Sequence, residues 1–324
     1  MRDRRWLGFV CWAAATGCGW PAGPARGRPP EGATALLVLP DDGGQTIPQA
    51  LAAARQRVWV EMYLLTAGDA LDALVAARRA GADVRVLLEP APYGAADDNQ
   101  GAYLTLQQAG VDVRWFSMPG GLVHIKLLLI DDAAWVLTPN LTSAGLTRNR
   151  EYAIIDRAPA DVARAEAVFQ ADQAGRSLDD DASTRVLVSP LDARPRLTAV
   201  IDAARASLSV EIEELSDGAV IAHLAAARGR GVMVSAIVPA ADRSAATEAA
   251  IAALRSAGVP VRVLSSPPLH AKAMVIDGAT AYLGSVNFTR ASLDDNRELG
   301  VLVTDAPIVS RVAATLESDW NDSQ

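Results

Sequence analysis

One stretch of sequence decides how this chain folds: HIKLLLID, residues His124–Asp131. A second copy follows as HAKAMVID, residues His270–Asp277. The chain has 30 lysine and arginine residues, and the only two lysines are the third residues of these two copies. Two of the three histidines open the copies, and the third is His223. Because the chain otherwise avoids both residue types, the repeated pattern indicates a function that requires them.

The spacing within each copy predicts where its side chains point. Side chains of a β-strand alternate between its faces, so His124 and Lys126 project together, about 7 Å apart along the strand. The four apolar residues after each lysine are typical of a strand covered on both faces. Asp131 has the opposite parity, and Asp131-Asp132 and Asp277-Gly278 favour a tight turn. We therefore expect the histidines and lysines to carry the chemistry and the aspartates mainly to hold the turn.

The repeat extends from Ala33 to the end of the chain, at an offset that shrinks from about 150 to 147 residues. Residues 33–40 align with 183–190, and each is an apolar run stopped by proline, as a buried strand is. The pattern then predicts strands at 58–61, 84–88, 208–211 and 232–238. It predicts helices at 47–55, 70–80, 161–174, 196–205, 220–230 and 308–320, with Gly81 and Gly231 as C-caps.

Strands that alternate with such helices indicate a layered α/β fold. We predict two copies of one unit, half 1 at residues 33–178 and half 2 at residues 179–324. Half of the residues are apolar, which is enough for a large core. The formal net charge of −8 disfavours an extended nucleic-acid footprint, since such a footprint needs a basic face.

Residues 1–18 are typical of an export signal. Three arginines, at positions 2, 4 and 5, precede an apolar stretch at residues 6–16 that is too short to span a bilayer. Both cysteines of the chain, Cys11 and Cys18, lie here, so the residues that follow cannot form disulfides. Residues 15–18 resemble a bacterial lipoprotein cleavage box, in which the cysteine is lipidated. We expect an exported protein of the bacterial cell envelope, lipid-anchored through Cys18, or a secreted one; an uncleaved leader is the remaining alternative. Residues 19–32, rich in proline, glycine and arginine, are expected to form a flexible tether.

Polar residues follow both copies of the motif at matched positions. The second copy continues with Gly284-Ser285-Val286-Asn287, and residues 287–298 align without a gap on residues 140–151. Both alignments end in Asn-Arg-Glu, at Glu151 and Glu298. Polar groups at a fixed distance from a His-Lys pair indicate side chains that orient the imidazoles and bind anionic oxygens.

The combination of His-x-Lys-x4-Asp, Gly-Ser-x-Asn and Asn-x-Glu, present twice in a duplicated α/β chain, resembles the phospholipase D superfamily. The resemblance covers Ala33 to the C-terminus. The second copy fits completely, whereas the first has Thr138-Pro139-Asn140 in place of Gly-Ser-x-Asn, with Thr138 as the candidate hydroxyl. The resemblance implies a layered α/β/α sandwich whose two halves are related by a pseudo-twofold axis and share one active site.

The resemblance also implies a mechanism. One histidine attacks phosphorus to form a phosphohistidine, and the other protonates the leaving alcohol and then activates water or an acceptor alcohol. By analogy His124 is the nucleophile and His270 the acid/base, tasks that imidazole can serve near neutral pH. The motif lysines and asparagines would hold the phosphoryl oxygens without a metal. The two glutamates match the carboxylates that hydrogen-bond the histidines.

The candidate catalytic residues are those of the two motifs: His124, Lys126, Asp131, His270, Lys272 and Asp277. The candidate residues that bind phosphate or orient the motif are Thr138, Asn140, Glu151, Ser285, Asn287 and Glu298. The sequence contains no local metal-ligand motif and no glycine-rich phosphate loop, so we expect neither a metal nor another cofactor.

These observations favour a phospholipase D-type phosphodiesterase that hydrolyses or transfers the phosphatidyl group of phospholipids at a membrane surface, acting as a monomer. One alternative is an endonuclease of the same superfamily, which the acidic balance disfavours. Another is a non-catalytic surface or binding protein, which the two intact His-Lys pairs disfavour. His223 is expected at the surface, and arginines beside the site are expected to be solvated. Glu61 and Glu211 reach the site or are structural carboxylates. Three tryptophans are expected mainly in the core: Trp59, Trp115 and Trp135.

Overall fold

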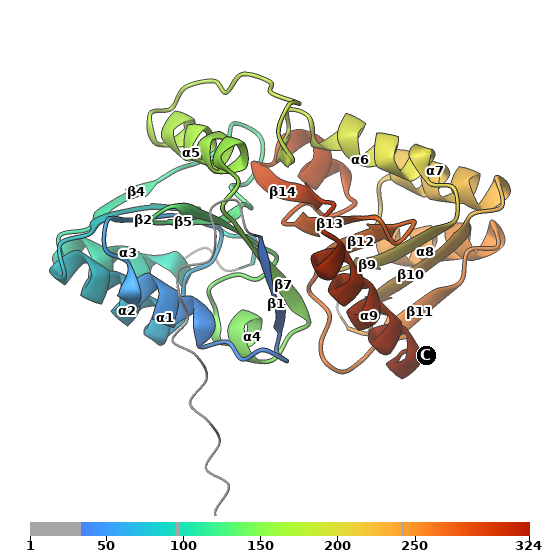
Figure 1. Cartoon of the computed structure of the whole chain (residues 1–324), viewed down its shortest axis with the longest axis horizontal. Coiled ribbons are helices and arrows are strands. Elements are labelled where there is room, and N and C mark those ends of the chain that lie inside the picture. The colour runs from blue at the N-terminus through green and yellow to red at the C-terminus, as the bar shows by residue number, and fades with distance from the viewer. Residues whose placement is uncertain (1–33, 95–97, 242) are drawn as a thin grey trace, which may run out of the picture. The chain divides into compact units, whose positions relative to one another are not determined.

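The computed structural model describes residues 34–94, 98–241 and 243–324. The predicted export signal, the tether and Cys18 therefore lie outside the described residues. Within residues 34–324, the strands form two seven-stranded sheets, one from each half of the chain (Figure 1).

The first sheet contains strands β1 (Ala35–Leu39), β2 (Arg57–Met62), β3 (Asp83–Leu88), β4 (Asp112–Trp115), β5 (Lys126–Ile130), β6 (Ala133–Leu137) and β7 (Glu151–Asp156). Their order is β1-β7-β6-β5-β2-β3-β4. Strands β2, β3 and β4 are parallel, and the other neighbours are antiparallel. The helices of this half are α1 (Thr46–Ala53), α2 (Gly68–Arg79), α3 (Asp98–Gln108), α4 (Ser143–Thr147) and α5 (Pro159–Gln173).

The second sheet contains strands β8 (Val186–Ser189), β9 (Ser207–Ile212), β10 (Met233–Pro239), β11 (Val261–Leu264), β12 (Lys272–Ile276), β13 (Thr280–Gly284) and β14 (Glu298–Val303). Its order, β11-β10-β9-β12-β13-β14-β8, is that of the first sheet read from the other end. The helices are α6 (Ala193–Ala203), α7 (Gly218–Gly229), α8 (Ala245–Ser256) and α9 (Ala306–Asp322), with a π-helical turn η1 (Ala291–Asp295). The predicted duplication of an α/β unit is confirmed, while its exact boundaries stay a prediction.

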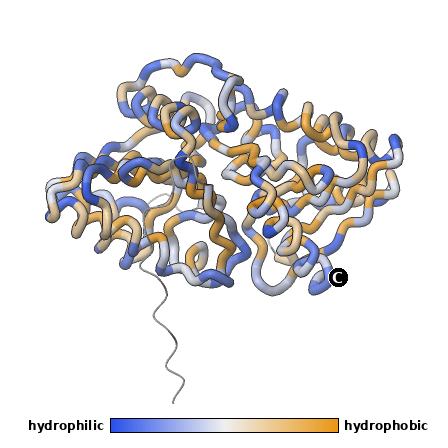
Figure 2. Tube along the Cα trace, in the orientation of Figure 1, coloured by the Kyte–Doolittle hydropathy of each residue, from blue (hydrophilic) through white to orange (hydrophobic). Residues whose placement is uncertain are grey.

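Three apolar cores explain the layers. One core joins α1, α2 and α3 to the first sheet, and a second joins α6, α7 and α8 to the second sheet. The third core contains residues of both sheets together with α5 and α9, so it holds the two halves to each other. Strands β5 and β12 are buried along their whole length, as their unbroken apolar runs predicted. Hydrophobic residues follow the strands in Figure 2, whereas many of the loops are hydrophilic.

Helices α2 and α7 end as the sequence predicted. Gly81 and Gly231 follow their last residues with φ of 97° and 94°, in the left-handed region that favours glycine. Helix α7 begins with a capping bond, because the Asp217 side chain accepts from the Val220 N–H. The two glycines mark where the chain turns from these helices into β3 and β10.

Two buried arginines connect the halves. Arg150 of half 1 donates to both carboxylate oxygens of Asp319 on α9, over 2.5 and 2.9 Å. Arg297 of half 2 pairs with Asp172 on α5, over 2.9 and 3.0 Å. Both guanidinium groups are buried, so the expectation of solvated loop arginines is wrong for these two. A buried charge needs such a partner, because desolvation without one is costly.

Glu61 and Glu211 lie inside the protein beside these ion pairs, and both are fully buried. The Tyr152 hydroxyl donates to Glu211 over 2.6 Å. Burial and the charge of Asp172 raise the pKa of Glu61 well above its ordinary value, and burial and Asp319 do the same to the pKa of Glu211. Of the two readings of these glutamates, the structural one fits, since neither lines the cavity described next.

Candidate active site

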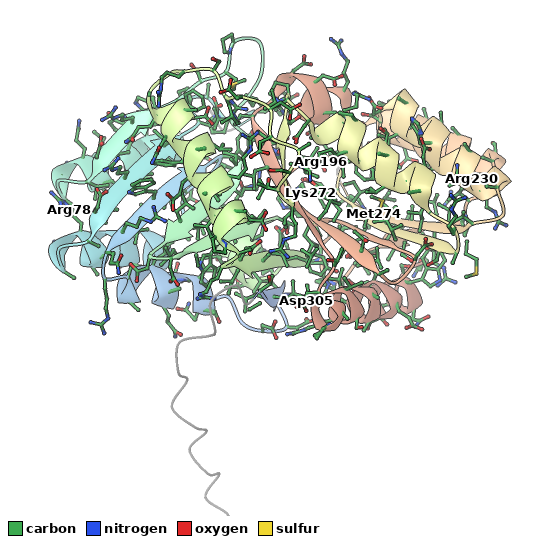
Figure 3. All side chains as sticks on the ribbon, turned by 45° about the horizontal axis from the view of Figure 1, so that its top comes forward. Arg78, Arg196, Arg230, Lys272, Met274 and Asp305 are labelled. Atoms are coloured by element: carbon green, nitrogen blue, oxygen red, sulfur yellow. The ribbon has the colours of Figure 1, made fainter. Side chains whose placement is uncertain are left out.

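One cavity of about 340 Å³ is lined by the motif histidines of both halves, His124 and His270. Half 1 also contributes Tyr63, Leu64, Tyr93, Leu122 and Asn140, and half 2 contributes Glu213, Glu214, Asn287, Thr289, Ala291, Ser292 and Asn296. The expected single site shared by the halves therefore has a structural counterpart. Lys272 lies in the interior of the protein, whereas Arg78 and Arg230 lie at its outer ends (Figure 3).

Each motif histidine stands just before its strand rather than within it. Strands β5 and β12 begin at the lysines, and the backbone N–H of His124 donates to the carbonyl of Arg297 in the other half, over 2.9 Å. Lys126 Nζ donates to the carbonyl of His124 over 2.8 Å, and Lys272 Nζ donates to that of His270 over 2.7 Å. The lysine of each motif therefore folds back beside its histidine, on the side that parity predicted.

The glutamates hold the histidines across the junction of the halves. His124 Nδ1 lies 2.9 Å from both carboxylate oxygens of Glu298, and His270 Nδ1 lies 2.6 Å from Glu151 Oε1. Each carboxylate thus comes from the opposite half, which the sequence did not reveal. With Nδ1 engaged, Nε2 is the nitrogen of each ring that can react or transfer a proton. Neither half contains a complete site by itself.

A hydroxyl group supports Glu151, and a second hydroxyl lies at the matching position of half 2. Thr138 Oγ1 donates to Glu151 Oε2 over 2.6 Å and accepts from the Tyr152 N–H over 2.8 Å. In half 2, Ser285 Oγ accepts from the Leu299 N–H over 3.0 Å. Thr138 therefore occupies in half 1 the place that Ser285 occupies in half 2, despite the shorter loop.

The site places several charges in a buried environment. Burial and the positive charges of Lys126 and Lys272 lower the pKa of His124 well below its ordinary value. Burial and Lys272 lower the pKa of Lys126 to about 7. Burial raises the pKa of Glu298 to about 7, although Lys126 opposes the rise. His124 is therefore neutral near neutral pH, as a nucleophile must be.

Sequence comparison of the halves missed two residues that make the site unequal. The ring of Tyr63 meets that of His124 edge-on, with centroids 4.6 Å apart. The matching residue in half 2, at the offset of 150, is Glu213, and its Oε1 lies 3.4 Å from His270 Nε2. Its Oε2 binds Lys272 Nζ and lies 3.3 Å from Asn287 Nδ2. The sequence contains one signal for this difference: Tyr63 and Glu213 do not match, although they stand two residues after the matched Glu61 and Glu211.

Asp131 and Asp277 do not line the cavity. Their place among the catalytic residues stays a prediction, whereas their contacts are those of the expected turns. The Asp131 carboxylate accepts backbone N–H groups of residues 55–57, over 2.7 to 3.2 Å. Asp277 does the same for residues 205–207, over 2.7 to 3.2 Å. Their φ angles of 51° and 52° place both in the left-handed region, as the predicted turns require. They fasten the starts of β2 and β9.

The substitution Asp277→Ala is expected to lower stability without altering chemistry. It removes a carboxylate that accepts three backbone N–H groups, which costs about 2 kcal/mol and lowers the midpoint of thermal unfolding by ~4 °C or more. Asp112→Ala, at an exposed aspartate paired with Arg114, is the control and should leave the midpoint unchanged. A loss of turnover in folded Asp277→Ala protein would contradict this structural role.

Other predicted residues lie where the sequence placed them. His223 is partly exposed on α7 and pairs with Asp202 over 2.7 Å. Trp59 and Trp135 are buried, and Trp115 packs against the core. Among the described residues, no cluster of three or more histidine, cysteine, aspartate or glutamate side chains is arranged to hold a metal ion. No helix within the described ranges is long and apolar enough to cross a membrane.

Fold and site together define a duplicated α/β protein in which the histidines of two His-Lys pairs line one cavity. The family model described as "Cardiolipin synthase, PLD-like domain" matches residues 47–173 and 197–320, and the chain belongs to this family of the phospholipase D superfamily.

Relatives within the family share part of the chain. The mitochondrial cardiolipin hydrolase of Xenopus tropicalis is 38% identical over 94 residues, which cover 29% of this chain and 44% of that protein. The minor cardiolipin synthase ClsB of Bacillus subtilis (strain 168) is 35% identical over 102 residues, which cover 30% of this chain and 26% of that protein. The matches thus span less than half of either relative.

Two solved structures share the fold of both halves. Polyphosphate kinase from Porphyromonas gingivalis aligns with a TM-score of 0.70 and 17% identity, over 89% of this chain and 50% of that one. Phosphatidylserine synthase from Haemophilus influenzae Rd KW20 aligns with a TM-score of 0.65 and 14% identity, over 89% of this chain and 85% of that one. At such identities the likeness concerns the fold alone.

Proposed function

We propose that this protein is a phospholipase D-type phosphodiesterase, which hydrolyses or transfers the phosphatidyl group of a phospholipid through a phosphohistidine. The observation that carries the proposal is the pair of imidazoles lining one cavity, each held at Nδ1 by a carboxylate of the opposite half. Family membership supports the reaction class, and the formal net charge of −8 favours lipid over nucleic acid as the substrate.

The unequal surroundings of the two rings support His124 as the nucleophile. Its neutral Nε2 attacks phosphorus, and the bond from phosphorus to the headgroup oxygen breaks. Glu298 at Nδ1 offsets the positive charge that the ring gains in this step. His270 Nε2 gives its proton to the departing alcohol, aided by Glu151 at Nδ1.

The second half of the reaction reverses these roles. Water or an acceptor alcohol gives its proton to His270 Nε2 and attacks phosphorus, and the bond from phosphorus to His124 breaks. Phosphatidate results from water, and a new phosphatidyl ester results from an alcohol. Lys126, whose Nζ lies beside His124, and the amide of Asn140, which lines the cavity, stabilise the phosphoryl oxygens in both steps of the proposed reaction.

A substrate panel tests the proposal. The full chain is incubated with vesicles of phosphatidylcholine, phosphatidylethanolamine, phosphatidylglycerol or cardiolipin, and with single- and double-stranded DNA, and the released alcohol or nucleotides are measured. We expect lipid headgroup release, and ³²P-labelled protein after a rapid acid quench with labelled lipid. Cleavage of DNA alone would favour the endonuclease, and cleavage of no diester would reject the enzymatic function.

A further inference from the structure

The two halves of the site differ in the side chain that lies beside the motif lysine, which is Tyr63 in half 1 and Glu213 in half 2. In half 2, the Glu213 carboxylate contacts His270 Nε2, Lys272 Nζ and Asn287 Nδ2. These are the groups with which half 2 would bind the oxygens of a phosphoryl group. An anion of this chain thus already occupies the half-2 position.

Half 1 presents the same groups without such an occupant. Lys126 Nζ lies 5.1 Å from the centre of the Tyr63 ring, and among the described residues no carboxylate forms an ion pair with it. Asn140 is 93% buried and lines the cavity, where its side-chain amide can donate from Nδ2 to a phosphoryl oxygen. The half-1 groups can therefore donate to the oxygens of a ligand, and Tyr63 stands where half 2 has the Glu213 carboxylate.

The negative charge of Glu213 disfavours a phosphoryl group beside the half-2 residues. Burial raises its pKa, but the charges of His270 and Lys272 outweigh this effect and lower the pKa well below the ordinary value. The carboxylate is therefore ionised throughout the neutral range. A phosphoryl oxygen close to it would meet a like charge in a partly desolvated cavity, where such repulsion is stronger than in water.

We propose that Glu213 determines headgroup specificity: phosphoryl oxygens bind the half-1 groups, and Glu213 accepts a hydrogen bond from a hydroxyl or ammonium group of the alcohol. This inference rests on the proposed function and adds the class of alcohol to it. The donor lies on the side of His270, the histidine that exchanges a proton with the alcohol oxygen. A headgroup that carries a second phosphate is disfavoured there.

A second cavity adjoins the catalytic cavity at Glu213 and Glu214. It has a volume of about 390 Å³ and shares Glu213, Glu214 and His270 with the catalytic cavity. Its lining in the described ranges contains no lysine or arginine. Since a phosphate ligand is normally bound by such cations, this cavity suits a neutral or cationic headgroup.

Binding of inorganic phosphate tests the charge of Glu213 without turnover. Isothermal titration at pH 7.5 compares wild type, Glu213→Gln and the matched control Glu248→Gln, whose carboxylate is exposed and paired with Arg243. We expect Glu213→Gln to bind phosphate about tenfold more tightly, a change of ~1.4 kcal/mol, and the control to match wild type. Equal affinity in Glu213→Gln and wild type, or no binding by either, overturns the proposal.

Headgroup selection is tested with three lipids. We expect wild type to prefer phosphatidylglycerol, with its hydroxyls, and phosphatidylethanolamine, with its ammonium, over cardiolipin. In Glu213→Gln the ratio of kcat/KM for cardiolipin to that for phosphatidylglycerol should rise about tenfold. An unchanged ratio overturns the specificity role. Tighter phosphate binding without turnover of any diester would instead reject the proposed function and leave the assignment of the phosphate position intact.

Discussion

The substitution His124→Asn is expected to lower kcat/KM for lipid by about 10⁴-fold or more, the scale seen when an enzyme loses its nucleophile. The protein should also no longer form the ³²P-labelled intermediate, because asparagine cannot replace the imidazole Nε2. Since Glu298 loses its ring partner, the fold must be checked by thermal unfolding. His223→Asn is the matched control, because His223 pairs only with surface Asp202 among the contacts described.

The substitution His270→Asn distinguishes the role of the general acid from that of the nucleophile. Removal of a general acid typically costs about 10²- to 10⁴-fold when the leaving alcohol is strongly basic. An aryl diester, whose phenolate leaves without a proton, should still phosphorylate His124 in this variant and give a burst of phenol. His124→Asn should give no burst with either substrate. A burst in His124→Asn but not in His270→Asn would reverse the two roles, and unchanged turnover in both would refute the mechanism.

Much of the fold followed from local pattern. The apolar runs at 84–88 and 208–211 became parts of β3 (Asp83–Leu88) and β9 (Ser207–Ile212), because buried strands and their stop signals are encoded by neighbours in sequence. Helices α3 and α8 are not among the helices predicted from the sequence.

The sequence predicted which residues form the site, but not which of them contact each other. The residues of each motif are neighbours in sequence. His124 and Glu298 are 174 residues apart, so their hydrogen bond forms only when the two halves pack together. Arg150 looked like a loop residue for the same reason, because its partner Asp319 lies 169 residues away. The repeat identifies positions at which the halves match, whereas Tyr63 and Glu213, which make the halves chemically different, stand at a position where they do not match.

The substitution Glu298→Gln is expected to lower kcat about 10²-fold, the effect typical of residues that support a catalytic group. The glutamine side chain would keep the shape but lose the charge that offsets the cationic ring of the phosphohistidine. The pKa of Glu298 is about 7, raised by burial, so wild-type activity should rise with pH through this value as the carboxylate forms. Above it, activity should fall, because the pKa of Lys126 is also about 7 and its charge is lost.

The pH–rate profile of Glu298→Gln should lack the rising limb and keep the falling one. Glu166→Gln, on the outer face beside Arg57, is the matched control and should show both limbs. Persistence of the rising limb in Glu298→Gln would mean that another group sets it.

The pH dependence of protein stability tests the pKa of Glu298 independently of activity. Because its pKa in the folded protein lies above the ordinary 4.5, the folded state keeps a proton that the unfolded chain releases. The protein therefore loses stability as pH rises from about 4.5 to 7, by up to roughly 3 kcal/mol. Glu298→Gln should remove this loss and unfold at a higher temperature than wild type at pH 8, but not at pH 4. A variant that is both slower and more stable would show that the buried charge serves catalysis at the expense of the fold.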